Sequence, residues 1–102
     1  MAVDFEKARR EELRWLILVS AYAGQPVGAS ETIILSAIQP VVPDLTLLEL
    51  RRELAYLEDR KLVAISNKQT LHWFVKINNH GVDCVEYTTE CYPGIARPAK
   101  WY

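Results

Sequence analysis

The strongest constraint in this sequence is a row of leucines with the period of one helix face. The leucines are separated by three, four and three residues, which is the spacing of a single buried stripe on an α-helix. They are Leu47, Leu50, Leu54 and Leu57. The row predicts a helix over about 46–60 whose leucine side packs into a core, with the intervening residues on the opposite, solvent-facing side.

The start of this helix carries a capping signal. Thr46 can accept a hydrogen bond from the first turn, and Glu49 stands where a glutamate completes a capping box. Residues 40–44 read Pro-Val-Val-Pro-Asp, and they predict a turn because both prolines oppose a continuous helix.

Two strand-like runs follow the leucine helix. The first, 62–65, is short and apolar, and the second, 71–77, contains Trp73 and Phe74, residue types favoured in strands. The polar segment 66–70 separates them. We therefore predict a β-hairpin, which must pack against the helices because two strands alone are only marginally stable.

The remaining segments complete one domain over 1–102, a length expected for a single domain. Asp4 and Ser30 stand where N-caps belong. Further helices are predicted over 4–23, 30–39 and about 82–90, followed by a tail from about residue 92. The predicted fold class is mainly α (α+β), in the order helix, helix, helix, strand, strand, helix.

The leucine helix and the hairpin carry a family resemblance. The pattern Leu50-x-x-x-Leu54-x-x-Leu57-Glu58-x-x-x-Leu62-Val63 is similar to a recognition helix that runs into the first strand of a wing. Ile77-Asn78-Asn79-His80-Gly81 is similar to the hydrophobic-Thr-x-x-Gly pattern that begins the helix after the wing. The chain thus resembles a winged helix-turn-helix domain along nearly its whole length. The resemblance implies three helices, a two-stranded β-hairpin wing, and a C-terminal helix and tail.

Two positions depart from the family pattern. Lys61 stands where the family often has a glycine in a left-handed conformation, which leaves the turn after the helix open. Asn78 replaces the usual threonine and keeps a side chain that can cap a helix.

The end of the chain carries a second resemblance. The segment Val85-Glu86-Tyr87-Thr88, followed by Pro93-Gly94-Ile95-Ala96-Arg97-Pro98, is similar to the ending of small winged-helix proteins of Mu-like transposable phages. It implies a phage or prophage gene and assigns no biochemical role by itself.

The winged-helix resemblance implies a regulator that binds duplex DNA, with the helix over about 46–60 in the major groove and the wing over about 66–72 on the backbone. Arginines on the side away from the leucines can contact guanine or phosphate. Residues 60–82 include four basic side chains and no acidic one. The predicted DNA-binding residues are Thr46, Leu48, Arg51, Arg52, Ala55, Lys68, Gln69 and His72.

The charge balance limits this hypothesis and keeps an alternative open. The chain has 12 basic and 13 acidic residues, so any DNA binding must use a local patch. The leucine helix also carries Glu49, Glu53, Glu58 and Asp59. The alternative is a module that grips a phage or host protein through Leu48, Ala55 and the aromatic tail.

The first helix is apolar almost all the way round from Leu13 to Ala23. A helix of that kind is buried on more than one side. Either a second copy or the chain's own elements cover the second side, and the aromatic tail either docks on the domain or reaches a partner. The predicted homodimer or partner interface consists of Leu13, Trp15, Ile17, Leu18, Trp101 and Tyr102.

Cys84 and Cys91 are predicted to be reduced thiols. Within one helix, their separation of seven residues would place them about 10 Å apart along the axis. A disulfide needs α-carbons within about 7 Å, so we expect a cytoplasmic protein. His80 and Cys84 make a poor zinc signature without a Cys-x-x-Cys pair, and we expect no cofactor.

Catalytic and membrane functions have no support in the sequence. It contains no glycine-rich phosphate loop, nucleophile motif or HExxH motif, so we do not expect an enzyme. No apolar run reaches the roughly 18 residues needed to cross a bilayer, so we expect no membrane partner.

Overall fold

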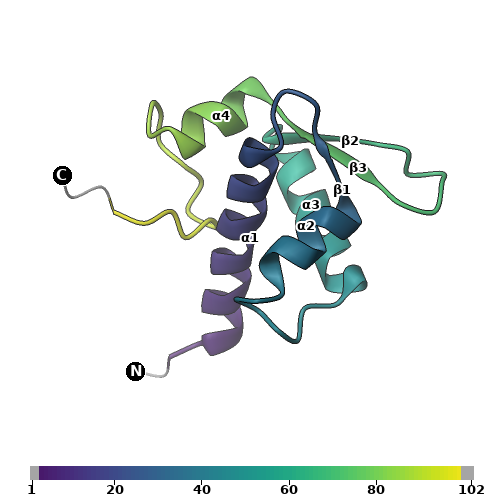
Figure 1. Cartoon of the computed structure of the whole chain (residues 1–102). Coiled ribbons are helices and arrows are strands. Elements are labelled where there is room, and N and C mark those ends of the chain that lie inside the picture. Colours follow the sequence, from purple (N-terminus) through teal and green to yellow (C-terminus); the bar gives the residue numbers. More distant parts are fainter. Residues whose placement is uncertain (1–2, 100–102) are drawn as a thin grey trace.

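Residues 3–99, which the computed structural model describes, form four helices and one three-stranded antiparallel sheet (Figure 1). The elements are α1 (Phe5–Ala23), β1 (Ala29–Ser30), α2 (Glu31–Ile38), α3 (Leu47–Asp59), β2 (Val63–Ser66), β3 (Phe74–Ile77) and α4 (Asn79–Val85). The predicted, mainly helical α+β class is confirmed. None of the helices in this range is long and apolar enough to span a bilayer.

The first three helices begin where the sequence predicts. The side chains of Asp4, Ser30 and Thr46 each accept a hydrogen bond from a backbone N–H three residues further on, which satisfies a donor that the helix leaves free. The prediction that the Glu49 side chain completes a capping box by bonding back to Thr46 is wrong. The Glu49 carboxylate pairs with Arg9 of α1, because a guanidinium offers a charged partner.

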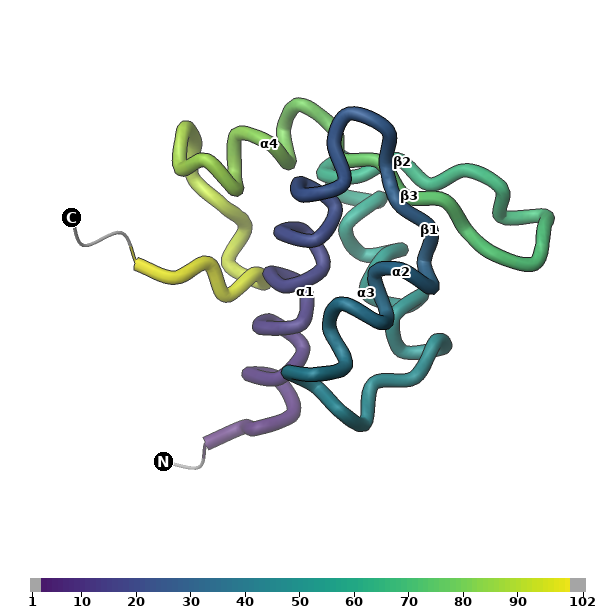
Figure 2. The backbone as a smooth tube through the Cα atoms, in the orientation of Figure 1, coloured from purple at the N-terminus to yellow at the C-terminus, as the bar shows by residue number. Residues whose placement is uncertain are grey.

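Helix α1 is the central element of the fold (Figure 2). Helices α2 and α3 pack on one side of it, and α4 with the C-terminal segment lies on the other. Leu13, Ile17 and Leu18 are each 0% exposed, because these elements cover them. The structure therefore places these three side chains in the core and corrects their assignment to a homodimer or partner interface.

A left-handed residue ends α3 and leads the chain directly into the hairpin. That residue is Lys61, with φ of 64°. Its N–H donates to the Glu58 carbonyl at 2.9 Å, and the Leu62 N–H donates to the Leu57 carbonyl at 3.0 Å. These bonds satisfy carbonyls at the helix end, and the resulting turn sets β2 beside α3.

The sheet has the strand order β1–β3–β2, and both pairs are antiparallel. The predicted hairpin is confirmed, but β3 begins at Phe74 rather than at 71. Strand β1 was not predicted, because two residues carry no alternation that could be recognised. It follows Gly28, whose φ is 98°, and a Cβ there would lie 2.7 Å from the Phe74 ring. Glycine thus permits β1 to approach β3.

Helix α4 covers 79–85 instead of the predicted 82–90. Asn78 precedes it, but the side-chain amide donates to the Lys61 carbonyl at 3.2 Å and makes no capping bond. After the helix, Tyr87 has φ of 62°. A left-handed residue of this kind cannot continue a right-handed helix, so the chain reverses there.

This reversal brings Cys84 and Cys91 together, and the prediction of reduced thiols is wrong. The prediction assumed that one helix holds both residues, but α4 ends at Val85. The two cysteines form a disulfide with α-carbons 5.4 Å apart. Because disulfides persist mainly in oxidising compartments, these residues no longer support the expectation of a cytoplasmic protein.

The segment after the disulfide packs back along α1. The Ala96 N–H donates to the Glu11 carbonyl at 3.0 Å, and Arg14 donates to the Gly94 carbonyl at 3.0 Å. Ile95 is buried between these two contacts. The C-terminal segment therefore belongs to the domain and covers the side of α1 that α2 and α3 leave open.

Candidate functional site

The predicted DNA-binding residues lie on the outward side of α3 and on the loop between β2 and β3. Leu48, Arg52 and Ala55 are exposed, and their spacing of four and three residues places them on one helix face. The loop is tied to α3 by polar contacts described below. We name this region the α3–hairpin surface, and its residues are Thr46, Leu48, Arg51, Arg52, Ala55, Lys68, Gln69, Leu71 and His72.

Arg51 does not extend freely into solvent, as the prediction of a base-reading arginine requires. Its Nε and Nη2 donate to the two oxygens of Glu31 at 2.7 and 2.6 Å. Nη2 also donates to the Leu71 carbonyl at 3.1 Å, and the guanidinium carbon lies 4.9 Å from the centre of the Trp73 ring. Arg51 thus occupies the edge of α3, between its buried and exposed faces.

Glu31, the partner of Arg51, is 0% exposed and begins α2. The hydrogen bonds from Arg51 hold the pKa of this carboxyl below its ordinary value, although burial acts in the opposite direction. A hydrogen bond with the Trp73 backbone also lowers the pKa of Glu31. The carboxylate therefore links three segments: α2, α3 and the end of the hairpin loop.

Lys68, predicted to anchor the wing on DNA, is also paired. Its ammonium contacts the Glu58 carboxylate of α3 and lies 5.6 Å from the centre of the Trp73 ring. The other Glu58 oxygen accepts a hydrogen bond from the Ile65 N–H at 3.2 Å. The lysine remains 44% exposed, so the pair stays open to water and to an approaching ligand.

The remaining predicted residues differ in whether their side chains already have a hydrogen-bond partner. His72 Nδ1 lies 3.4 Å from Glu31 Oε2, whereas Gln69 is exposed in the loop. The Thr46 hydroxyl accepts the N–H of Glu49 at 3.2 Å, so it already serves as the helix cap. The Thr46 side chain is therefore already in use, and a ligand at this end of α3 would meet the backbone N–H groups of the first helical turn.

Arg52 is the cation of the α3–hairpin surface that has no partner within residues 3–99. It is exposed, and no hydrogen bond or ion pair joins it to another described side chain. Arg51 and Lys68, in contrast, are neutralised by Glu31 and Glu58. Of the basic residues Arg51, Arg52 and Lys68 on this surface, Arg52 is therefore the one whose positive charge is not compensated by a carboxylate partner among the described residues.

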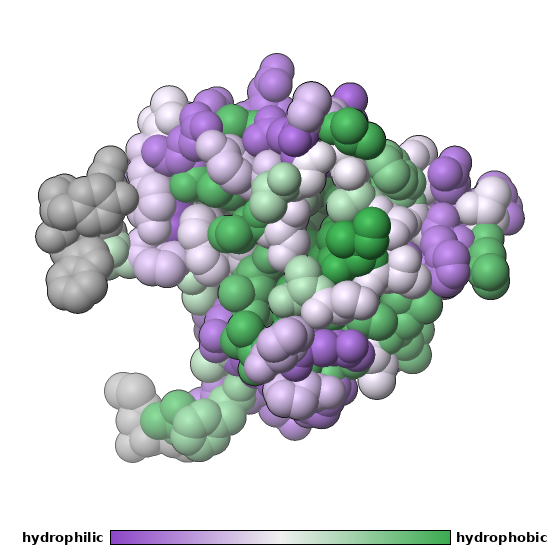
Figure 3. All heavy atoms as spheres, viewed as in Figure 1, coloured by the Kyte–Doolittle hydropathy of each residue, from purple (hydrophilic) through white to green (hydrophobic). Residues whose placement is uncertain are grey.

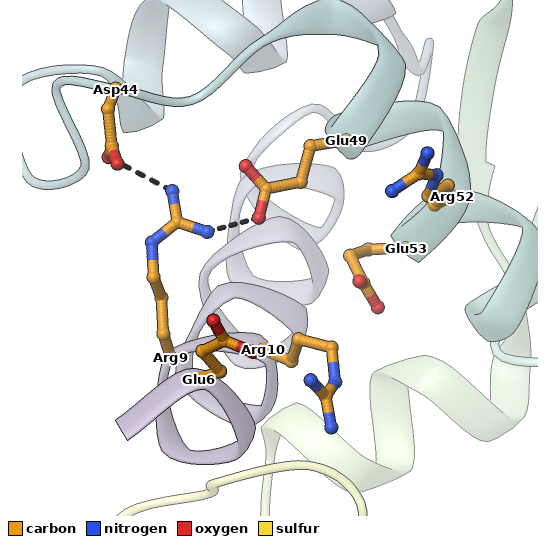
Figure 4. Close-up of a pocket in the computed structure, with 7 residues that line it drawn as sticks. All are labelled: Glu6, Arg9, Arg10, Asp44, Glu49, Arg52 and Glu53. Carbon is orange, nitrogen blue, oxygen red and sulfur yellow. Dashed lines mark hydrogen bonds and ion pairs between the residues drawn. The ribbon is translucent and has the colours of Figure 1, made fainter. Parts of the chain in front are cut away.

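A polar cleft that the sequence analysis did not predict lies between α1 and α3 (Figure 4). Its volume is about 420 Å³. In it, Arg9 binds Asp44 at 3.0 Å and also pairs with Glu49, which lowers the pKa of Asp44. No local pattern signals these pairs, because the partners are 35 and 40 residues apart. The lining residues are Glu6, Arg9, Arg10, Asp44, Glu49, Arg52 and Glu53.

Apolar side chains gather over α1 and α2 on the face shown in Figure 3. Between these helices lies a groove of about 320 Å³ with uncharged walls, where Ile33 is 63% exposed. Among the predicted partner residues, Trp15 is half-buried, with its ring centre 6.3 Å from that of Tyr87. Trp101 and Tyr102 lie outside the described residues.

No group of three His, Cys, Asp or Glu side chains within residues 3–99 is placed to hold a metal ion. His80 faces the Tyr92 ring edge-on, with ring centres 5.8 Å apart, and Cys84 is in the disulfide. In comparisons with protein-family models, curated proteins and solved structures, no match to this chain was found.

Proposed function

We propose that this chain is a winged-helix protein that binds duplex DNA through the α3–hairpin surface. One observation carries the proposal: an exposed helix face with an unpaired arginine, Arg52, lies beside a hairpin loop that polar contacts join to the same helix. A helix face of this kind fits the major groove, and a neighbouring hairpin can reach the backbone or the minor groove.

Each part of the surface has chemistry that suits DNA. Arg52 can donate two hydrogen bonds to guanine or one to a phosphate, and the methyl groups of Leu48 and Ala55 can contact thymine. The free N–H groups at the start of α3 can meet a phosphate. In the hairpin loop, Lys68 and Gln69 can contact the backbone.

The pairing of Arg51 and Lys68 with carboxylates shapes the expected binding. Only cations that replace counterions on phosphate contribute to the salt dependence of the affinity. We therefore expect weak non-specific binding and a small salt dependence, to which the unpaired Arg52 contributes. Sequence preference comes from base contacts of the exposed Arg52, Leu48 and Ala55.

The biological role in this proposal comes from the sequence resemblances. They suggest a phage or prophage transcriptional regulator that acts on DNA in the cytoplasm, and we propose that it does so as a homodimer. Two copies would set two α3 helices into successive major grooves. Because Leu13, Ile17 and Leu18 belong to the core, the dimer would use another surface, for which the apolar α1–α2 groove is a candidate.

The test is fluorescence anisotropy with a mixed-sequence duplex and with the duplex upstream of the gene, at low and at physiological salt. We expect the protein to bind, to prefer the upstream duplex, and to weaken with added salt. Arg52→Ala should weaken binding, whereas Lys7→Ala, which removes an equal charge from α1, should not. Absence of binding to both duplexes at about 50 mM salt would refute the proposal.

The second candidate is a protein-binding module, and the exposed leucines favour it. Leu48 is 64% exposed and Leu71 is 80% exposed, so the same surface offers apolar anchors to a phage or host protein. This candidate predicts no DNA binding together with a partner that Leu48→Ser releases. A salt-sensitive DNA complex that Arg52→Ala weakens would favour the first candidate.

A further inference from the structure

Arg51 and Arg52 are neighbours in the middle of α3 but have opposite surroundings. Arg51 makes three hydrogen bonds, to Glu31 and to the Leu71 carbonyl. Arg52 is exposed without a partner in the described range, and its guanidinium stands at the wall of the cleft between α1 and α3 (Figure 4). The same side-chain type is therefore used in two different ways one residue apart.

The contacts of Arg51 converge on the hairpin. Its guanidinium Nε and Nη2 donate to both oxygens of the fully buried Glu31. Nη2 also donates to the carbonyl of Leu71 in the loop. Glu31 in turn donates its backbone N–H to the Trp73 carbonyl at 2.9 Å. The loop between β2 and β3 is thus fastened to α2 and α3 close to where β3 begins.

Arg51 would have to break its bonds to Glu31 and to the Leu71 carbonyl in order to contact DNA. If its side chain turned outward, a carboxylate without exposed area would lose its charged partner. Breaking such a pair costs more than one contact with a base edge returns. A lysine would also be a poor substitute, because only the planar guanidinium can serve both carboxylate oxygens and the carbonyl at fixed angles.

We propose that Arg51 is a positioning residue that holds the hairpin loop against α3, and that Arg52 is the arginine of this helix that contacts DNA. The role of Arg52 rests on the proposed function. The role of Arg51 does not, since it concerns the order of the loop in the free protein. Arg51 then affects DNA binding only through the place that it gives to Lys68 and Gln69.

Two matched variants, Arg51→Gln and Arg52→Gln, test this division because each removes one charge from adjacent positions. The first readout is amide hydrogen exchange by NMR at Thr70, the loop residue whose N–H donates to the Asn67 carbonyl at 3.0 Å, with the α1 core amides at 13–21 as an internal control. We expect Arg51→Gln to speed exchange in the loop about tenfold without matching changes in α1. We expect Arg52→Gln to leave exchange in both segments unchanged.

The second readout is the slope of log affinity for DNA against log salt concentration. Arg52→Gln should make this slope shallower by up to about 0.9, the value of one phosphate contact. Arg51→Gln should weaken binding and leave the slope unchanged, because Glu31 already neutralises this arginine. Equal changes of slope in the two variants would overturn the assignment.

The two halves of the proposal fail separately. If the wild-type protein binds no DNA, the role of Arg52 falls together with the proposed function, and the exchange data alone judge Arg51. Unchanged exchange in the loop of Arg51→Gln would refute its positioning role. If this variant does not fold, Arg51→Lys replaces it, and faster exchange in the loop of a folded, still charged variant is the expected result.

Discussion

The two faces of α3 differ in nearly every physical respect although they share one backbone. On the inner face, Leu50, Leu54 and Leu57 are each 0% exposed and pack against α1, α2 and β2. On the outer face, Leu48 and Arg52 are exposed. The inner face therefore carries stability, and the outer face is free to carry a contact with a partner.

Between these two faces, the edges of α3 carry charged side chains that pair with other helices. Arg51 and Glu53 lie there, and each forms an ion pair with another helix, Arg51 with Glu31 of α2 and Glu53 with Arg14 of α1. At the edge of a helix, a charged side chain can reach a partner on a neighbouring element, as the buried Glu53 and the partly exposed Arg51 do. Charges at such positions orient the packing of helices, and counting them as part of the outer face overstates its charge.

The largest expected effect separates the two faces directly. Leu54→Ala should lower the free energy of unfolding by about 3 kcal/mol, because it removes buried methyl groups and leaves a cavity. The matched change Leu48→Ala, on the outer face of the same helix, should cost under about 0.5 kcal/mol. Urea unfolding followed by circular dichroism measures both, and similar losses would contradict the comparison.

The next largest loss of unfolding free energy is expected when the ion pair between Arg51 at the edge of α3 and Glu31 is removed. The size of this loss should depend on pH. Glu31→Gln should cost about 2 kcal/mol at neutral pH, because the ion pair with Arg51 becomes a hydrogen bond from the charged guanidinium to a neutral amide. The pKa of Glu31 in the folded protein lies below the ordinary value of 4.5, so its ionised form stabilises the fold above that value. This contribution is lost as the pH falls through the folded pKa.

The difference in stability between wild type and Glu31→Gln should therefore shrink as the solution is acidified below the ordinary carboxyl pKa. Urea unfolding over a series of pH values measures it. Glu12→Gln, at an exposed position of α1, is the control and should show little difference at any pH. A gap that stays constant for Glu31→Gln would mean that the carboxylate charge does not stabilise the fold.

A smaller effect is expected at the start of α3, where both faces depend on the same cap. Thr46→Ala should cost about 1 kcal/mol, because the N–H of Glu49 loses its acceptor. Thr46→Ser keeps the hydroxyl and should retain most of the stability. The two variants are compared by thermal unfolding, and equal losses would show that the cap contributes nothing.

The smallest effect is expected from an ion pair that is open to water. Lys68 and Glu58 are 44% and 31% exposed, so Lys68→Ala should cost only about 0.5 kcal/mol. High salt should remove even this difference, because exposed charges are screened. A loss as large as that of Glu31→Gln would show that burial does not set the value of these pairs.

Elements whose causes are local can be predicted from the amino-acid sequence. Asp4, Ser30 and Thr46 cap their helices through bonds to residues three positions away, and the leucine spacing alone predicted the buried face of α3. The hairpin was predicted from two apolar runs and a polar turn. All these signals act within a few residues, which is the range over which a sequence pattern can be recognised.

Features that depend on distant partners arise only when the helices and strands pack together. Strand β1 exists because β3 lies beside it, and the disulfide forms because the chain reverses after α4. Arg51 was expected on the outer face, but it lies within reach of Glu31, 20 residues earlier in the chain. Whether a charged side chain points to solvent or to a buried partner is settled only when the elements pack, because the partner does not belong to its own helix.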